Sequence, residues 1–196
     1  MAEGVNEMIR DGAEAKVIRR NNRLVKSRIP KRYRVWELDE RIRRERTRAE
    51  ARLISQARRA GVATPVIYDI YNSTIEMDYI EGKPLKHVIS EDLCEKLGEL
   101  VGRLHAAGII HGDLTTSNII WDGSKMWLID FGLAFSAEDL ESRGVDVHVL
   151  FQTLQSSHPN HEALIDAFCR GYNRTLEAAK DVLERVVEIE TRGRYA

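Results

Sequence analysis

The order of apolar and polar positions divides this chain into a strand-rich first part and a helical second part. In the first 30 residues, short alternating segments such as AKVIRR and RLVKSRI are separated by the polar pairs DG at 11–12 and NN at 21–22. Alternation with a period of two predicts half-buried strands, and polar pairs between them predict hairpin turns. Two more strands are expected at 65–71 and 74–80.

A long helix interrupts these predicted strands. Residues 37–60 are rich in Glu, Arg and Ala, which favour helix, and Gly61 marks the end of the segment. The sparse apolar stripe of this helix consists of Leu38, Ile42, Ala49, Leu53 and Ile54. The Arg-rich stretch 41–52 could face RNA, but its alternating acids favour a solvated or partner-facing helix.

From residue 82 onward the pattern becomes helical. Apolar residues spaced three or four apart predict amphipathic helices, and IIWDGSKMWLID at 119–130 predicts a tight hairpin with its turn at the DG pair. The predicted helices lie at about 91–107, 143–155, 160–172 and 175–190. We therefore predict an α+β fold of two lobes, 1–81 and 82–196, and a cleft between two lobes is a common ligand site.

Composition and charge exclude several classes of protein. The 196 residues are 43% hydrophobic and 31% charged, which is typical of a soluble globular protein. The net charge of −1 provides no global attraction to nucleic acid or membrane, and no apolar run is long enough to cross a bilayer. Cys94 and Cys169 lack the spacing of a zinc site or a disulfide framework, so we expect a reducing cytoplasm.

Three polar residues of the second part form the sharpest pattern. Asp113 and Asn118 lie five apart in HGDLTTSN, and Asp130 ends the second strand of the hairpin that begins directly after Asn118. Because a hairpin returns the chain to its start, we expect Asp130 beside Asn118. Two oxygen ligands at a strand end suit Mg²⁺, which completes its shell with water and phosphate. Asp113, close by, could orient a nucleophilic hydroxyl and accept its proton.

The order HGD-x₄-N, followed by DFG at 130–132, resembles the catalytic and metal loops of the protein-kinase superfamily. The alternative is a polar turn followed by an unrelated bend, and two motifs in order on an apolar hairpin favour the kinase interpretation. The resemblance implies a bilobal kinase-like fold that binds ATP with Mg²⁺.

That resemblance implies further nucleotide-binding residues in the first lobe. A kinase pairs a strand Lys with a helix Glu to hold the phosphates, and Lys26 and Glu50 stand in suitable positions. Glu50 could equally be one more solvated charge. The segment covering the nucleotide would comprise Ile9, Arg10, Asp11, Gly12, Ala13, Glu14, Ala15, Lys16 and Val17.

The adenine would contact a hinge strand within IEMDYIEG. Met77 would lie at the back of the pocket, Asp78, Tyr79 and Ile80 would form its edge, and Ile120 would form its floor. Met77 and Ile120 could equally be ordinary core residues.

Several positions depart from the pattern of typical protein kinases. The covering loop RDGAEAKV contains a single glycine, and Thr115 stands where protein kinases carry a Lys that contacts the transferred phosphate. Only thirteen residues separate Gly132 from Asp146, and no APE sequence follows. We therefore expect a reduced C-terminal lobe without an activation segment, and hence without a groove for a peptide substrate.

With these departures the sequence resembles one small family, the Bud-type or PRPK family. This is the atypical Ser/Thr kinase of the KEOPS (EKC) complex, a relative of the RIO kinases. The matching segments are GAEA at 12–15, RRERTRAEARLI at 43–54, HGDLTTSN at 111–118, IDFGLA at 129–134, VDVHVL at 145–150 and RGRY at 192–195. Carried across, Asp113 is the proton acceptor, and Asn118 and Asp130 are the Mg²⁺ ligands. Asp146 resembles the buried Asp that braces the catalytic loop.

The same resemblance implies a biological setting. The complex makes the N6-threonylcarbamoyl modification of adenosine in tRNAs that read codons beginning with A. Its kinase-like subunit binds the threonylcarbamoyl-transferring subunit and a small accessory subunit, hydrolyses ATP and autophosphorylates. In this family a basic tail is implicated in tRNA binding, and the resemblance implies such a role for Arg192, Arg194 and Tyr195, beyond the last predicted helix. A frayed terminus is the alternative interpretation.

Two other functions compete with this one. A small-molecule kinase of the aminoglycoside or choline type shares HGD, but the fifty residues after Asp146 leave little room for its substrate lobe. A pseudokinase scaffold would also show the fold, although the set of Lys26, Glu50, Asp113, Asn118 and Asp130 argues against one.

Overall fold

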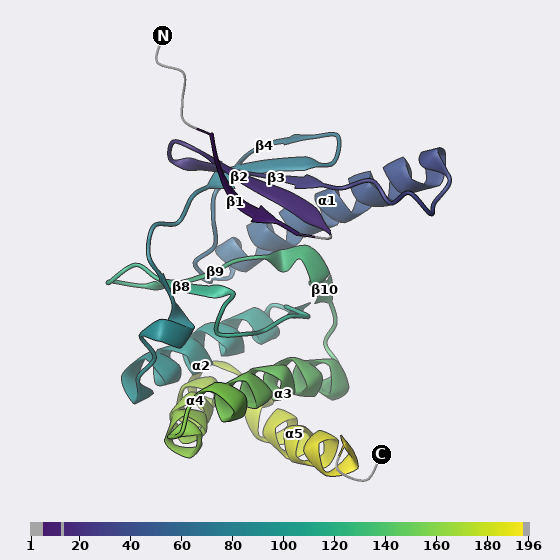
Figure 1. The fold of residues 1–196 in the computed structure, drawn as a ribbon. Coiled ribbons are helices and arrows are strands. Elements are labelled where there is room, and N and C mark those ends of the chain that lie inside the picture. The colour runs from purple at the N-terminus through teal and green to yellow at the C-terminus, as the bar shows by residue number, and fades with distance from the viewer. Residues whose placement is uncertain (1–5, 13, 194–196) are drawn as a thin grey trace.

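A sheet with one long helix stacks above a bundle of helices (Figure 1). The computed structural model describes residues 6–12 and 14–193. The upper elements are β1 (Asn6–Asp11), β2 (Ala15–Arg20), β3 (Arg23–Arg28), α1 (Trp36–Arg59), β4 (Ile67–Tyr71) and β5 (Thr74–Asp78). Their strands form one antiparallel sheet in the order β1-β2-β3-β5-β4. The predicted hairpins are therefore present, with Asn21 in the left-handed turn conformation between β2 and β3.

The remaining described elements are mostly helical. Short strands and turns are β6 (Lys83–Pro84), η1 (Leu85–His87), β7 (Ile109–Ile110), β8 (Ile119–Trp121), β9 (Met126–Leu128), η2 (Phe131–Leu133) and β10 (Phe135–Ser136). The helices are α2 (Glu91–Ala106), α3 (Leu140–Ser157), α4 (His161–Thr175) and α5 (Ala179–Gly193). The predicted α+β fold is confirmed, and the expected border at 81–82 falls between β5 and β6. Along the described chain, no helix is both long enough and apolar enough to cross a bilayer.

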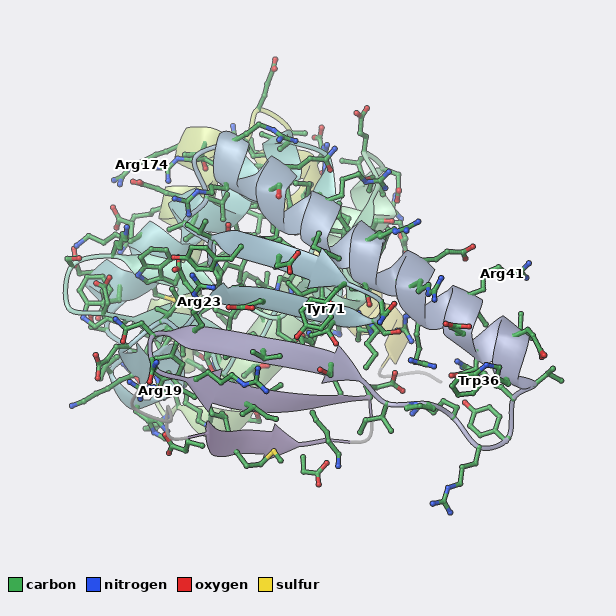
Figure 2. The ribbon with its side chains drawn as sticks, turned by 90° about the horizontal axis from the view of Figure 1, so that it is seen from above. Arg19, Arg23, Trp36, Arg41, Tyr71 and Arg174 are labelled. Atoms are coloured by element: carbon green, nitrogen blue, oxygen red, sulfur yellow. The ribbon has the colours of Figure 1, made fainter. Side chains whose placement is uncertain are left out.

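The helix α1 lies along the sheet, and its first turns extend past it, carrying Trp36 and Arg41 outward (Figure 2). Its buried residues include Asp39 in the first turn and then Thr47, Glu50, Leu53 and Ile54 farther along the helix. The predicted stripe is wrong at Leu38, which is 42% exposed, because the first turn buries the neighbouring Asp39 instead, at 1% exposure.

The helices below share one core. The helices α2 and α4 cross so closely that a Cβ on Gly171 would lie 1.8 Å from the carbonyl oxygen of Glu95. Only glycine permits this approach, and it brings Phe168 and Tyr172 of α4 into the centre of the core. Leu114 of the predicted catalytic loop belongs to the same core.

Candidate functional site

The ion pairs of Lys26 join the sheet, α1 and the loop after β9. Lys26 lies in the middle of β3, opposite Val17 of β2 and Ile75 of β5. Its Nζ lies 2.6 Å from Oε1 of Glu50 and 2.6 Å from Oδ1 of Asp130. The structure therefore brings together three residues that are 24 and 104 positions apart in the chain.

Asp130 stands at a strained point of the backbone. Its φ of 61° and ψ of 64° place a non-glycine residue in the left-handed region, directly before the turn η2. Burial alone would raise the pKa of this carboxyl, but the charge and hydrogen bond of Lys26 and a hydrogen bond from the Gly132 N–H outweigh it, and the pKa lies below the ordinary value. Asp130 is thus held as a carboxylate, the form that binds cations.

The catalytic-loop residues Asp113 and Asn118 contact each other directly. The amide Nδ2 of Asn118 donates to the main-chain oxygen of Asp113 at 2.9 Å and to its Oδ2 at 2.8 Å. The acceptor oxygen of the same amide then remains as the atom that could hold a cation. The main chain of Asn118 also accepts from Ile129 N–H at 3.0 Å, so the hairpin returns Asp130 to its side as expected.

Asp146 braces the loop from below. This residue of α3 is 2% exposed and accepts the main-chain N–H groups of His111 at 2.8 Å and Gly112 at 2.9 Å. Gly112 has φ +76°, and a Cβ there would lie 2.4 Å from the oxygen of Leu133 in the loop after Asp130. One carboxylate and one glycine therefore fix the catalytic loop against the metal loop, as the resemblance implied for Asp146.

Two histidines complete this brace. His111 donates from Nε2 to the carbonyl of Ile129 at 3.0 Å and accepts the Asp113 N–H at 3.3 Å on Nδ1. Buried His105 contacts Asp146 through Nε2 at 3.2 Å and the Tyr172 hydroxyl through Nδ1 at 2.6 Å. Burial raises the pKa of Tyr172, so its phenol keeps its proton and can donate to His105. His105 had no predicted role, because contacts 41 and 67 residues away leave no local signal.

A cleft of about 260 Å³ opens above these residues. Its lining comprises Gly12, Glu14, Ala15, Val17, Lys26, Arg28, Arg46, Asp113, Asp130, Gly132 and Leu133. Four members of the predicted covering segment therefore face it. Exposed Ile9, Asp11 and Lys16 do not line it, because alternate residues of a strand point to opposite faces. Ala13 and the side chain of Arg10 lie outside the described residues.

The predicted adenine residues are not among those that line this cleft. Met77 is buried against Ala51 and Ile75. The N–H of Asp78 donates to Val66 O at 2.9 Å. The N–H of Tyr79 donates to Asn22 O at 3.0 Å, so the main-chain donors of Asp78 and Tyr79 are already paired within the protein. Ile120 lies on β8, paired with Trp127 of β9.

The cleft also contains basic residues that the sequence did not single out. Arg28 donates from Nη2 to Oε2 of Glu50, so that carboxylate is shared between Lys26 and Arg28. Arg46 of α1 lies 3.3 Å from Oε2 of Glu14. Sequence spacing could have identified both residues. Arg28 lies two residues after Lys26, on the same face of the strand, and Arg46 lies four residues before Glu50, on the same face of the helix.

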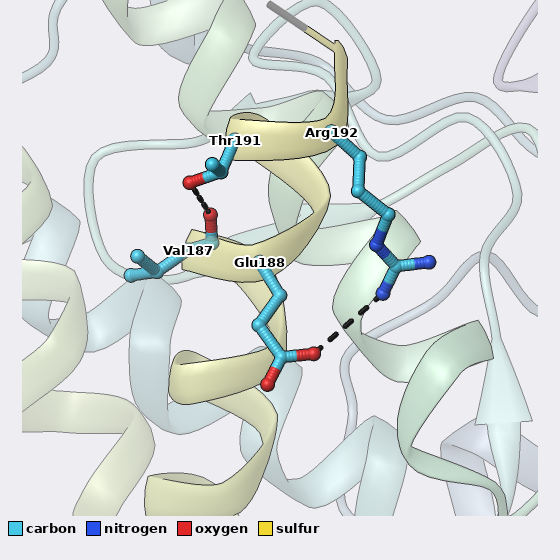
Figure 3. Close-up of a pocket in the computed structure, with 4 residues that line it drawn as sticks. All are labelled: Val187, Glu188, Thr191 and Arg192. Carbon is cyan, nitrogen blue, oxygen red and sulfur yellow. Dashed lines mark hydrogen bonds and ion pairs between the residues drawn. The ribbon is translucent and has the colours of Figure 1, made fainter. Parts of the chain in front are cut away.

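The C-terminal prediction needs one correction. Arg192 lies inside α5 rather than beyond the last helix, because its pairing with Glu188 one turn earlier, at 3.6 Å, supports a longer helix. Arg192 also approaches Glu141 of α3 at 3.6 Å. With Val187, Glu188 and Thr191 it lines a shallow hollow of about 530 Å³ (Figure 3). Arg194 and Tyr195 lie outside the described residues.

A sheet lobe with a Lys–Glu pair lies over a helical lobe with Asp113 and Asp130 at the cleft and Asn118 bonded to Asp113, and this arrangement defines a protein-kinase-like domain. The loop after Asp130 is short: η2 and β10 lead directly into α3 at Leu140. The expected absence of a long activation segment therefore holds in the described chain.

Comparison with known families assigns the chain more narrowly. A model of the RIO domain matches residues 16–166, which is most of the chain. The chain is 49% identical over 184 residues to a probable serine/threonine-protein kinase BUD32 homolog of Archaeoglobus fulgidus, covering 94% of both chains. The chain belongs to the RIO domain family, and the predicted resemblance to Bud-type kinases is confirmed.

Longer relatives are also similar to this chain in sequence, and solved structures are similar to it in fold. The chain is 57% identical to a probable bifunctional tRNA threonylcarbamoyladenosine biosynthesis protein of Methanosarcina barkeri, covering 96% of this chain. It spans about a third of the length of such bifunctional relatives, 34% in this case. The fold matches the Rio2 kinase of Chaetomium thermophilum in a complex with ADP, Mg²⁺ and phosphoaspartate, with a TM-score of 0.64, 17% identity and coverage of 95% and 70%. It also matches WaaP with acyl carrier protein, with a TM-score of 0.69, 17% identity and coverage of 98% and 89%.

Proposed function

We propose that this chain is an ATP- and Mg²⁺-dependent phosphotransferase of the atypical Ser/Thr kinase type, with ATPase activity, that supports threonylcarbamoyl modification of tRNA. The observation that carries the proposal is the convergence of Lys26, Glu50 and Asp130 within 2.6 Å contacts beside Asp113 and Asn118. Kinase families use this set of side chains for phosphoryl transfer. The printed names of the relatives support the biological setting.

Lys26 and Glu50 would orient the nucleotide. Glu50 holds Lys26 from α1, so the ammonium stays at the cleft, where it can donate to phosphate oxygens. Lys26 pairs with Asp130 as well, and binding of a cation by Asp130 would release the ammonium for the phosphates. The pair thus couples the position of α1 to the phosphate site.

Asn118 and Asp130 would hold Mg²⁺. Among the described residues, no group of three or more His, Cys, Asp and Glu side chains could hold a metal by itself. A site with two protein oxygens fits Mg²⁺, which usually completes its shell with water and phosphate. When bound, the ion neutralises phosphate charge that develops during transfer.

Asp113 would act on the nucleophile. Its Oδ2 is fixed by the Asn118 amide, so the carboxylate can orient a hydroxyl or a water for attack on the terminal phosphate and accept its proton. The short segment before α3 provides no long activation loop on which a peptide could dock. This favours water, or a Ser or Thr of the protein itself, as the nucleophile, and hence ATPase and autophosphorylating activity.

We propose the partners from the same family. The bifunctional relatives are named for tRNA threonylcarbamoyladenosine biosynthesis, which favours association with a threonylcarbamoyl-transferring subunit in a KEOPS-type complex. A small accessory subunit and a tRNA contact through Arg192, Arg194 and Tyr195 complete the proposal. A cytoplasmic location follows from this role in tRNA modification.

A small-molecule kinase is the second candidate. An amicoumacin kinase shares the fold with a TM-score of 0.64 at 13% identity. Phosphorylation of an alcohol metabolite without partner proteins would favour this function. A pseudokinase scaffold is disfavoured because Lys26, Asp113 and Asp130 line one cleft, with Glu50 bonded to Lys26 and Asn118 bonded to Asp113.

The test is ATP hydrolysis by the purified chain, alone and then with the transferase partner and tRNA. We expect slow Mg²⁺-dependent turnover that increases in the complex. Asp113→Asn should reduce turnover about 10²- to 10⁴-fold, the usual contribution of a positioned base, while largely sparing nucleotide binding. Unchanged turnover in this variant would contradict the assignment of Asp113, and the absence of any nucleotide binding would contradict the proposed function.

A further inference from the structure

Arg28 is a buried cation that the proposed function does not use. It lies two residues after Lys26 on β3, so both side chains project from the same face of the strand. Its side chain is 6% exposed, and its Nη2 donates to Oε2 of Glu50 while Lys26 donates to Oε1. Each carboxylate oxygen of Glu50 therefore pairs with a different cation, although a single cation would neutralise its charge.

Arg28 also has donor capacity that the described residues do not satisfy. Its Nε is buried and has no hydrogen-bond partner among them. A guanidinium has five N–H donors and cannot be deprotonated in a protein, so a buried donor without an acceptor is costly. Arg28 nevertheless lines the cleft together with Asp113, Asp130 and Gly132. An anion in the cleft would meet a charged donor group that is already in place.

The charges at this corner balance only while the cleft holds no anion. Lys26 and Arg28 face Glu50 and Asp130 there, two cations against two carboxylates. In the proposed reaction the carboxylate of Asp130 binds a cation instead of Lys26. Lys26 and Arg28 can then pair with Glu50 and with the nucleotide phosphates. Arg28 then neutralises phosphate charge that Lys26 alone would leave unpaired.

A carboxylate of the covering loop already occupies the basic edge beside Arg28. Glu14 lies 3.0 Å from Nζ of Lys31 and 3.3 Å from Nη1 of Arg46, and it lines the same cleft as Arg28 and Arg46. A hydrogen bond from Lys31, with further attraction from Arg46 and Arg28, lowers the pKa of Glu14 despite partial burial. The edge thus attracts an anion even within the protein itself.

We propose that Arg28, with Arg46 beside it, contacts the phosphate groups of the nucleotide, and that Glu14 occupies this basic edge until the nucleotide arrives. The proposal rests on the proposed function, because the nucleotide is its ligand. Arg28 is thereby a second phosphate-binding residue on β3 beside Lys26. Glu14 is a competing internal anion that lines the same cleft.

The experiment compares the affinities of the whole chain for Mg²⁺-ATP and for adenosine by titration calorimetry. Arg28→Gln should weaken ATP binding about tenfold or more while changing adenosine binding less than twofold, because only ATP carries the phosphates. The matched control is Arg23→Gln on the same strand, which removes an exposed cation paired with Glu76 and should leave both affinities unchanged. Equal loss for ATP and adenosine, or no loss for either, would overturn the role of Arg28.

Two exposed positions keep the test decisive if Arg28→Gln does not fold. Arg46→Gln, at a side chain that is 37% exposed, should weaken ATP binding severalfold without affecting adenosine. Glu14→Gln should strengthen ATP binding severalfold, because the internal competitor loses its charge. Weaker ATP binding by Glu14→Gln, or unchanged ATP binding by Arg46→Gln, would overturn the proposal. If the unaltered chain bound neither ligand, the proposed function would fail together with this inference, whereas ATP binding that is insensitive to all three changes would refute this inference alone.

Discussion

Replacing Asp146 by Asn removes one negative charge from beneath the catalytic loop and leaves the shape of the side chain unchanged. The carboxylate accepts from His111 N–H at 2.8 Å, from Gly112 N–H at 2.9 Å and from His105 Nε2 at 3.2 Å. An amide has one acceptor oxygen, so at least one of these donors would face an NH₂ group in a site that is 2% exposed. A hydrogen bond to a charged group contributes about 1.5–3 kcal/mol, and a buried donor left without a partner adds a similar cost. We therefore expect Asp146→Asn to lower the free energy of unfolding by about 3 kcal/mol at pH 7.

The assay is urea unfolding of the native chain and the variant, extrapolated linearly to water. The control is Asp92→Asn, which removes a carboxylate that is 74% exposed and paired with Lys96, and it should change the free energy of unfolding by less than about 0.5 kcal/mol. A loss below about 0.5 kcal/mol for Asp146→Asn as well would refute the reasoning, because the carboxylate would then not be the acceptor that fixes the loop.

The same pair of proteins gives a pH dependence with a defined sign. Burial alone would raise the pKa of Asp146, but the hydrogen bond and charge of His105 and the main-chain N–H of His111 outweigh it, so its pKa lies below the ordinary value. The stabilisation is therefore fully present above the unfolded-state pKa of about 4 and is lost as the pH falls through the lower folded-state pKa. The difference in stability between the native chain and Asp146→Asn should be constant from pH 7 to about pH 5 and should shrink below about pH 4. A difference that grows on acidification would contradict the direction of the shift.

Two further predictions follow from the geometry. Gly112→Ala should lower the free energy of unfolding by about 1–2 kcal/mol, because the backbone there is left-handed. It should also lower ATP turnover more than ATP binding, because the new Cβ would lie 2.4 Å from Leu133 O and displace the predicted metal loop. Normal turnover by this variant would show that the two loops move independently. Deletion of residues 192–196 should weaken stimulation by tRNA in the assembled complex without changing basal autophosphorylation, and equal stimulation of both forms would leave the segment as an ordinary terminus.

Local patterns predicted most of the elements, because the period of the apolar residues follows directly from which face is buried. The hairpins at 11–12, 21–22 and 122–123 were confirmed, as was a long helix ending before Gly61, where φ is +82°. The predicted ends of the helices were less accurate than the predicted turns. The helix α3 begins at Leu140 rather than near 143, because Asp139 accepts the Ser142 N–H as an N-cap and supports an earlier start.

The cleft was predictable only where residues carry a motif. Asp113, Asn118 and Asp130 stand in recognisable spacing, and Lys26 with Glu50 followed from the resemblance. Arg28 and Arg46 looked like two of many solvated cations, since their ion pairs with Glu50 and Glu14 join different elements. The contacts of His105 with Asp146 and Tyr172 depend on three helices meeting, and no local pattern encodes that meeting.

The central claim is that Asp130 binds a magnesium ion which, together with Lys26, holds ATP for phosphoryl transfer. The most direct measurement is ATP hydrolysis as a function of Mg²⁺ concentration for the native chain and for Asp130→Ala. We predict that turnover by the native chain rises with Mg²⁺ concentration and saturates. Turnover by Asp130→Ala should be lower by at least about 10²-fold at all Mg²⁺ concentrations, because the variant lacks a Mg²⁺ ligand. Lys26 would then pair with Glu50 alone. Equal turnover with the same Mg²⁺ dependence in the two proteins would contradict the central claim.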